Sequence, residues 1–96
     1  MRDYELMCVL NPDLDEAGLE AQNERLKTLI GSRKGEIVNV DSWGRRRMAY
    51  PIKGFRDGIY QVTRFKMPPE ETVALERNLR LTEPILRHLV VRHESQ

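Results

Sequence analysis

The order of strand-like and helix-like segments along the chain constrains its fold more than any other feature of the sequence. Four segments are rich in β-branched or alternating apolar residues, and two carry apolar residues at helical spacing. The expected strands are residues 3–10, 36–50, 59–67 and 85–91, and the expected helices are residues 15–34 and a segment from Pro68-Pro69 to about Leu81. The order β-α-β-β-α-β folds, through right-handed crossovers, into the ferredoxin-like arrangement. We therefore predict an α+β fold with a four-stranded antiparallel sheet and two helices on one of its faces.

The apolar faces of these segments indicate one core. Leu6, Cys8 and Leu10 share a face of the first strand, and Leu26 and Ile30 belong to the apolar stripe of the first helix. A chain of 96 residues has room for one such core. We therefore expect residues 1–96 to form a single domain, with the last few residues as a short, frayed tail.

Turn-forming residues mark the predicted boundaries. Asp13 or Asp15 is suited to cap the first helix, because a short carboxylate accepts hydrogen bonds from free backbone N–H groups. In the long second strand, Gly44 predicts a bend and Pro51 predicts a weakening or an end of the strand. The polar, glycine-containing segment 53–58 is then expected to form the loop of a hairpin.

Several classes of site are excluded by the residues that the chain has. One cysteine cannot form an intramolecular disulfide, and one cysteine with two histidines supplies no zinc framework. Cys8 is expected to be a small buried apolar group, and His88 and His93 should point to opposite faces of a strand. We therefore expect no metal and no cofactor. The charged first residues and the lack of a long apolar run indicate a cytoplasmic protein without a membrane segment.

The net charge of +1 conceals an uneven distribution of charge along the chain. Residues 1–24 carry one base and seven acids (−6), residues 25–66 carry eleven bases and three acids (+8), and residues 67–96 carry four bases and five acids (−1). The basic block is densest at Arg45-Arg46-Arg47, in or beside the second strand. Arg45 and Arg47 should face one side of that strand and Arg46 the other.

An arginine-rich strand with aromatic neighbours suits RNA, because guanidinium groups bind phosphate in bidentate fashion and aromatic rings stack on unpaired bases. The competing interpretation is that these bases only protect an edge strand from aggregation. Trp43 is either an anchor for a protein partner or a ring that covers the sheet edge. Tyr4, Tyr50 and Tyr60 either display their rings on the open face of the sheet or pack in the core.

Residues 44–52, Gly-Arg-Arg-Arg-Met-Ala-Tyr-Pro-Ile, closely resemble the signature of the bacterial small-subunit ribosomal protein S-six family. The start Arg2-Asp3-Tyr4-Glu5, the following Val9-Leu10-Asn11-Pro12 and the ending at Val90-Val91 resemble the family as well, so the resemblance covers nearly the whole chain. Met48 departs from the usual leucine, which is a volume-conserving change. The sequence stops soon after the last expected strand, whereas some relatives carry long C-terminal extensions.

The resemblance implies a ferredoxin-like structural protein that binds the central domain of small-subunit ribosomal RNA as a heterodimer with small-subunit protein eighteen. It implies a place in the cytoplasmic small ribosomal subunit, a role in subunit assembly and no small-molecule substrate. For RNA contact we select the bases of the central block and two at strand ends, namely Arg2, Arg45, Arg46, Arg47, Lys53 and Arg92. Arg2 and Arg92 are expected to form a second small patch, because the first and last strands could be neighbours. For partner contact we select Trp43, Tyr50 and Tyr60.

Two other classes of protein share this order of elements. Acylphosphatases need a phosphate-binding loop with an arginine directly after the first strand, but here that loop, residues 11–15, is acidic. We therefore expect no enzyme and no catalytic residue. A ferredoxin-like regulatory or dimerisation module without RNA binding is the second alternative, and such a module has no need for three adjacent arginines.

Overall fold

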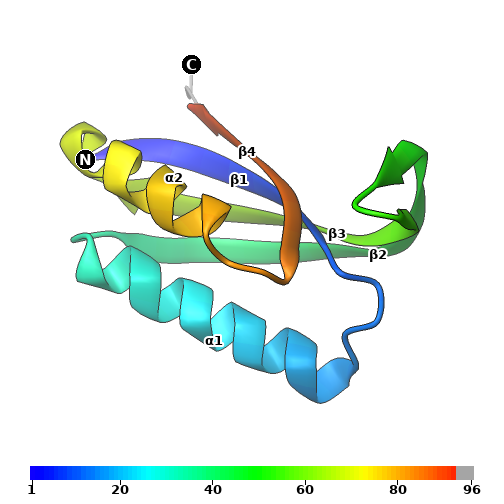
Figure 1. Ribbon diagram of the computed structural model, residues 1–96. Coiled ribbons are helices and arrows are strands. Elements are labelled where there is room, and N and C mark those ends of the chain that lie inside the picture. The colour runs from blue at the N-terminus through cyan, green and yellow to red at the C-terminus, as the bar shows by residue number, and fades with distance from the viewer. Residues whose placement is uncertain (93–96) are drawn as a thin grey trace.

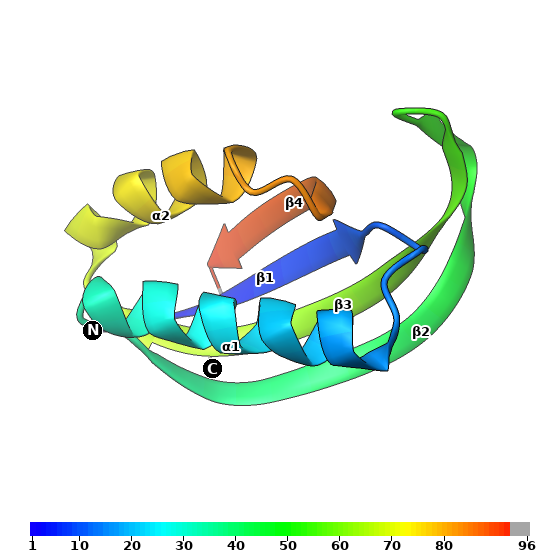
Figure 2. The same ribbon diagram turned by 60° about the horizontal axis from the view of Figure 1, so that its bottom comes forward.

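A computed structural model describes residues 1–92 and contains the predicted elements in the predicted order. The strands are β1 (Arg2–Leu10), β2 (Glu36–Ile52), β3 (Phe55–Met67) and β4 (Ile85–Arg92). The helices are α1 (Glu16–Ser32), the short 3₁₀ turn η1 (Pro69–Glu71) and α2 (Thr72–Arg80). The strands form one antiparallel sheet in the order β2-β3-β1-β4, and both helices cover the same face (Figures 1 and 2). The ferredoxin-like prediction is therefore confirmed.

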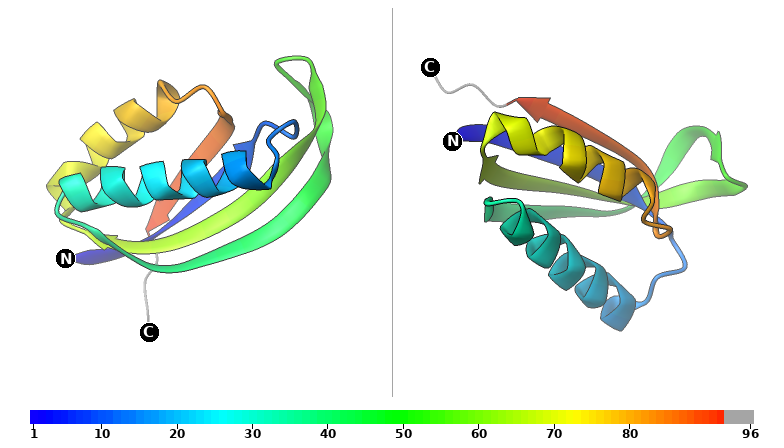
Figure 3. Two further views of the ribbon diagram at one scale, coloured as in Figure 1. Left: turned by 90° about the horizontal axis from the view of Figure 1, so that it is seen from below. Right: turned by 60° about the vertical axis from the view of Figure 1, so that its left-hand side comes forward.

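The core lies between the sheet and the two helices. In β1, Leu6, Cys8 and Leu10 point toward the helices, as predicted, and Tyr4 joins them with its ring stacked on Phe65 of β3. The helices contribute Leu26, Ile30, Leu75 and Leu79 to this cluster. The opposite face of the sheet has no helix over it, and we call it the open face (Figure 3).

Local interactions explain where α1 begins and ends. The Asp15 carboxylate accepts a hydrogen bond from the Gly18 N–H at 2.7 Å, so Asp15 is the cap. The helix ends at Ser32, earlier than expected, because Lys34 adopts a left-handed backbone with φ of +62°. Gly35 follows where a Cβ would lie 2.7 Å from the Lys66 carbonyl, so only glycine lets β2 enter the sheet here.

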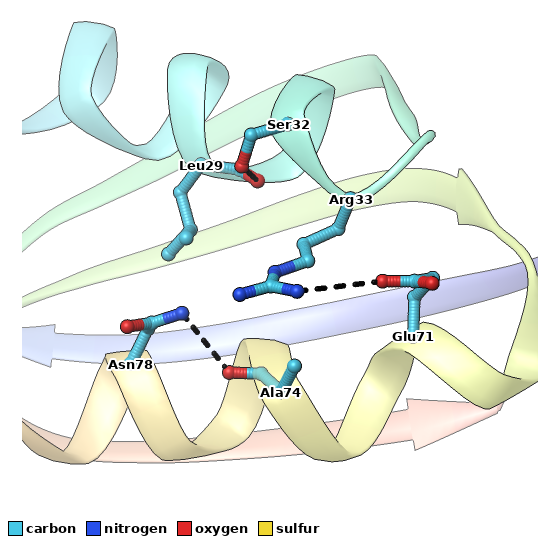
Figure 4. Close-up of polar contacts among 6 residues, drawn as sticks. All are labelled: Leu29, Ser32, Arg33, Glu71, Ala74 and Asn78. Carbon is cyan, nitrogen blue, oxygen red and sulfur yellow. Dashed lines mark hydrogen bonds and ion pairs between the residues drawn. The ribbon is translucent and has the colours of Figure 1, made fainter.

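The two helices are joined at one end by a polar contact. Arg33 Nη1 lies 3.7 Å from Glu71 Oε1, which links the end of α1 to η1 (Figure 4). The Asn78 amide in α2 donates a hydrogen bond to the Ala74 carbonyl at 3.1 Å and stays within its own helix. The ion pair therefore connects two elements that lie far apart along the chain.

Of the two outcomes predicted at Pro51, the second strand shows the weakening and not the end. Strand β2 continues through Pro51 to Ile52, because the ladder to β3 is interrupted between Arg47 and Ile52. Four residues, 48–51, face only Arg56 there, so the missing N–H of Pro51 costs no ladder hydrogen bond. The predicted bend at Gly44 is confirmed by its φ of +76° and by a register shift beside it.

The hairpin loop is also shorter than predicted. Strand β3 begins at Phe55, and the connection is a two-residue turn of Lys53 and Gly54 with φ values of +51° and +85°. Positive φ at both positions is the geometry that matches the twist of paired strands. The segment expected to be a loop is therefore mostly strand.

The distal part of this hairpin extends past the end of β1 and bends out of the line of the sheet (Figure 1). A second apolar cluster of Val9, Met48 and Leu86 holds it there, with Ile52 and Phe55 packed against it. Gly58 makes the contact possible, because a Cβ at this position would lie 2.3 Å from Val9 Cγ1. The tail and His93, about which the sequence made predictions, lie outside the described residues.

Candidate nucleic-acid and partner interface

The three adjacent arginines lie on the distal hairpin and alternate in direction, as expected for a strand. Arg45 and Arg47 are paired in register with Ile59 and Asp57, whereas Arg46 is paired with Gly58. All three are exposed. Residues 44–58 carry five bases and the single acid Asp57, a charge of +4. We call this segment the basic hairpin. Its bases are Arg45, Arg46, Arg47, Lys53 and Arg56.

Two of these arginines are oriented by neighbouring groups. Arg45 Nε lies 3.8 Å from Asp57 Oδ2, and Arg46 Nε donates a hydrogen bond to the Trp43 carbonyl at 3.2 Å. Arg47 and Arg56 line a hollow of about 290 Å³ beside Tyr50 and Pro51. Bases therefore surround the hairpin on both of its faces, and Lys53 occupies its turn.

Trp43 lies on the open face of the sheet. Its indole Nε1 donates to Asp41 Oδ2 at 3.1 Å, and the ring borders a hollow that also contains Met7 and Val62 of the central strands. Trp43 follows Asp41 by two residues and therefore lies on the same face of the strand, and the register with β3 slips beside it, between Ser42 and Gly44. The ring therefore leans over the sheet with part of its surface exposed.

The three tyrosines divide between the two alternatives. Tyr4 is buried in the core, whereas Tyr50 and Tyr60 line a cavity on the open face, beneath the curl of the basic hairpin. The Tyr50 hydroxyl accepts a hydrogen bond from Arg87 Nη1 at 3.1 Å. This contact joins the hairpin to β4, the opposite edge strand.

The predicted RNA contacts form two separate patches, as expected. Arg92 is paired in register with Tyr4, two residues beyond Arg2, so these two bases lie near each other as expected. They lie at the end of β1 remote from the basic hairpin, which projects past Leu10. The six selected bases therefore form two separate groups.

Sequence reasoning left two neighbouring residues out of the site. Arg56 shares the hollow of Arg47, and Arg87 bonds Tyr50 across the open face. Arg56 is adjacent to the basic block in sequence and was within reach of the charge argument. Arg87 was not, because its contact with Tyr50 depends on the curl of the hairpin.

Other chemistry receives no support within the described residues. Burial raises the pKa of the Cys8 thiol to about 12, so this cysteine is a packed core group. No group of three metal-ligating side chains occurs among residues 1–92. In the same part of the chain, none of the helices has the length and apolar character needed to cross a membrane.

Comparison with known proteins places these features in a family. The family model described as ribosomal protein S6 matches residues 3–92. The small ribosomal subunit protein bS6 of Caldanaerobacter subterraneus subsp. tengcongensis is 46% identical over 95 residues, which is 99% of this chain and 100% of the relative. The protein of the same name from Carboxydothermus hydrogenoformans is 42% identical over 95 residues, covering 99% of each chain.

Solved structures agree. The crystal structure of 30S ribosomal protein S6 from Thermotoga maritima superposes with a TM-score of 0.88 at 36% identity, covering 96% of this chain and 87% of that one. The Arabidopsis thaliana protein At3g17210, at 10% identity and a TM-score of 0.58 over 100% of this chain and 96% of that one, shares the fold alone. By its matched residues, its full-length relatives and its architecture, this chain belongs to the ribosomal protein S6 family.

Proposed function

We propose that this chain is a structural, non-enzymatic protein of the cytoplasmic small ribosomal subunit. It binds the central domain of the subunit's ribosomal RNA jointly with small-subunit protein eighteen, and this joint binding supports subunit assembly. The observation that carries the proposal is the basic hairpin, because three of its five exposed bases lie within residues 44–52, the segment that resembles the family signature, and the other two follow it closely.

The chemistry of the hairpin supports RNA as its ligand. Guanidinium groups bind phosphate oxygens in a fixed fork, and a projecting two-stranded ribbon can approach a folded RNA from either side. Arg46, Arg47 and Lys53 are the strongest candidates for phosphate contact, because Arg45 already lies beside Asp57. Arg2 and Arg92 would form a second, smaller contact at the far end of the sheet.

The open face supports a protein partner. Trp43 and Tyr50 are 45% and 59% exposed, and Leu89 and Val91 of β4 add exposed apolar surface to the same face. Aromatic residues that are exposed on one partner and buried in a complex are typical anchors of protein interfaces. Trp43, Tyr50 and Tyr60 are therefore assigned to contact with protein eighteen.

A binding titration tests the proposal. A fragment of the ribosomal RNA central domain is titrated with the chain, alone and with protein eighteen, at two salt concentrations. The partner should tighten RNA binding, and higher salt should weaken it because phosphate contacts release counterions. Absence of RNA binding at low salt would favour the regulatory or dimerisation module instead.

The basic hairpin has a matched control in the same chain. The double variant Arg46→Ala/Arg47→Ala should weaken RNA binding and reduce its salt dependence by about two phosphate contacts. Arg77→Ala/Arg80→Ala removes two exposed arginines from α2, on the helix-covered side, and should bind RNA as the wild type does. Equal losses in both double variants would contradict the assignment of the site to the hairpin.

A further inference from the structure

A cavity of about 250 Å³ separates the curled basic hairpin from the flat part of the open face. One wall belongs to the hairpin and the other to the strands β1, β3 and β4. The side chains that form these walls are mainly apolar: Met48 and Ile52 on one side, and Met7, Val9, Tyr60 and Leu89 on the other. The cavity therefore lies between two parts of the molecule that have different proposed ligands.

We propose that this cavity receives one large apolar side chain of the protein partner, and that filling it fixes the angle at which the hairpin presents its arginines to RNA. The inference rests on the proposed function, and it adds a specific anchor and a physical link between the two ligands.

The size and lining of the cavity favour an amino-acid side chain. Its volume lies below the range of about 300–1,000 Å³ that is usual for small-molecule pockets. None of the lining residues in the described part of the chain is a carboxylate, so a cationic group would find no counter-charge. An RNA base is recognised through hydrogen bonds at its edges, whereas most of the side chains that line this cavity are apolar. An apolar side chain requires no such partner.

The surroundings of the cavity are continuous with an exposed apolar surface. Leu89 at its rim is 54% exposed, and Val91, which follows on the same face of β4, is 49% exposed. An apolar pocket inside an apolar patch is the arrangement in which interface anchors are found. The occupant is therefore assigned to the same partner that covers the open face.

The link to RNA follows from how the hairpin is held. Its distal part is two-stranded and projects past β1, and an isolated two-stranded ribbon is marginally stable. It is attached to the sheet by the cluster of Val9, Met48 and Leu86 and by the bond from Arg87 to Tyr50. An occupant of the cavity touches both walls and so restricts the hairpin before RNA arrives. RNA then binds an arm that is already ordered.

A charge placed at the rim tests the anchor. Leu89→Glu should weaken binding of protein eighteen by about tenfold or more, because a carboxylate would be desolvated in the interface. The matched control Val73→Glu places the same charge at a residue that is 62% exposed on α2, and should change nothing. RNA binding without the partner should stay within about twofold for both variants, while the gain from adding the partner is lost in Leu89→Glu.

The other outcomes overturn the inference in distinguishable ways. Unchanged partner affinity in Leu89→Glu removes the anchor and leaves the proposed function standing. Weaker RNA binding in the absence of the partner assigns the cavity to a base. If the wild type self-associates in sedimentation and Leu89→Glu does not, the cavity is assigned to a second copy of this chain. If the wild type binds neither RNA nor partner, the proposed function fails and the inference fails with it.

A distance measurement tests the effect on the hairpin directly. Spin labels on Lys53→Cys and Val73→Cys report the separation of the hairpin turn from α2, and buried Cys8 should remain unlabelled. Protein eighteen should narrow the distance distribution, and Leu89→Glu at saturating partner should leave it broad. An equally narrow distribution with and without the partner would show that the hairpin angle is already fixed, which overturns the link.

Discussion

Phe65 and Phe55 lie on the same strand, β3, but in two different environments. Phe65 is fully buried between the sheet and the helices and stacks on Tyr4, with ring centroids 5.5 Å apart. Phe55 lies in the distal hairpin, where it is partly buried against the small cluster around Met48. The comparison teaches that one strand connects a region held by a closed core to a projecting region held by a small, partly exposed cluster.

The largest expected effect is a difference in the free energy of unfolding between variants of these two phenylalanines. Phe65→Ala should lower the free energy of unfolding by about 3–5 kcal/mol, since it leaves a cavity in the core. Phe55→Ala should cost about 1 kcal/mol, because its site is partly solvated and can relax. Urea denaturation of both variants measures the difference. Similar losses would mean that the hairpin cluster is as important for stability as the core.

A substitution at the junction between the two regions, where Gly58 meets Val9, should lower the free energy of unfolding by a smaller amount. Gly58→Ala brings a Cβ against Val9 Cγ1 and should destabilise the protein by about 1–3 kcal/mol. The control is Gly31→Ala in α1, where no atom lies within 4 Å of the added Cβ, and where alanine should stabilise by about 0.5–1 kcal/mol. Thermal unfolding of the pair checks both signs, and an unaffected Gly58→Ala would mean that the hairpin bends away from β1 freely.

The buried thiol of Cys8 makes the stability of the folded protein depend on pH in the alkaline range. Unfolded Cys8 loses its proton above about pH 9, while the pKa of the folded thiol is about 12, so the folded state holds the extra proton between these values. Stability therefore falls as the pH rises, by about 1 kcal/mol between pH 8 and 10. Cys8→Ala should lack this portion of the slope when both proteins are unfolded in urea at the two pH values. Identical slopes would place the thiol in contact with water.

The smallest effect on stability is expected from replacing exposed arginines of the basic hairpin. Arg46→Ala/Arg47→Ala should change the free energy of unfolding by no more than about 0.5 kcal/mol, because both side chains are exposed. The same variant should weaken RNA binding and incorporation into small subunits, so function and stability would separate at these positions. A large loss of stability would show that the Arg46 bond to the Trp43 carbonyl supports the fold.

Prediction from the sequence succeeded where structure depends on neighbouring residues. The faces of β1 and the apolar stripes of both helices follow from local spacing and are found as expected, and of the two candidates for the cap of α1, Asp13 and Asp15, the structure selects Asp15. At Pro51 the same reasoning held in part. The ladder is interrupted there, as a weakening proline predicts, but the strand does not end, because four residues bulge opposite Arg56 and leave no ladder bond for Pro51 to lose.

The sequence predicted which basic residues belong to the candidate site, but only partly how the fold arranges them. Charge clustering pointed to Arg45, Arg46 and Arg47, and they do lie together on an exposed hairpin. Arg2 and Arg92 were selected as a second small patch from their places at the ends of the first and last strands, and the pairing of β1 with β4 does bring them together, at the end of the sheet remote from the hairpin. The sequence does not say how far apart these two patches lie.

By itself, the sequence determined the order of elements, the inward faces and the basic segment of the family signature, since each depends on residues close together in the chain. Only the tertiary structure decided how the hairpin curls, because the curl depends on Gly58 meeting Val9 and on Arg87 reaching Tyr50. These contacts join segments that are distant in sequence, and they form only once the sheet has assembled. The cavity beneath the curl exists for the same reason.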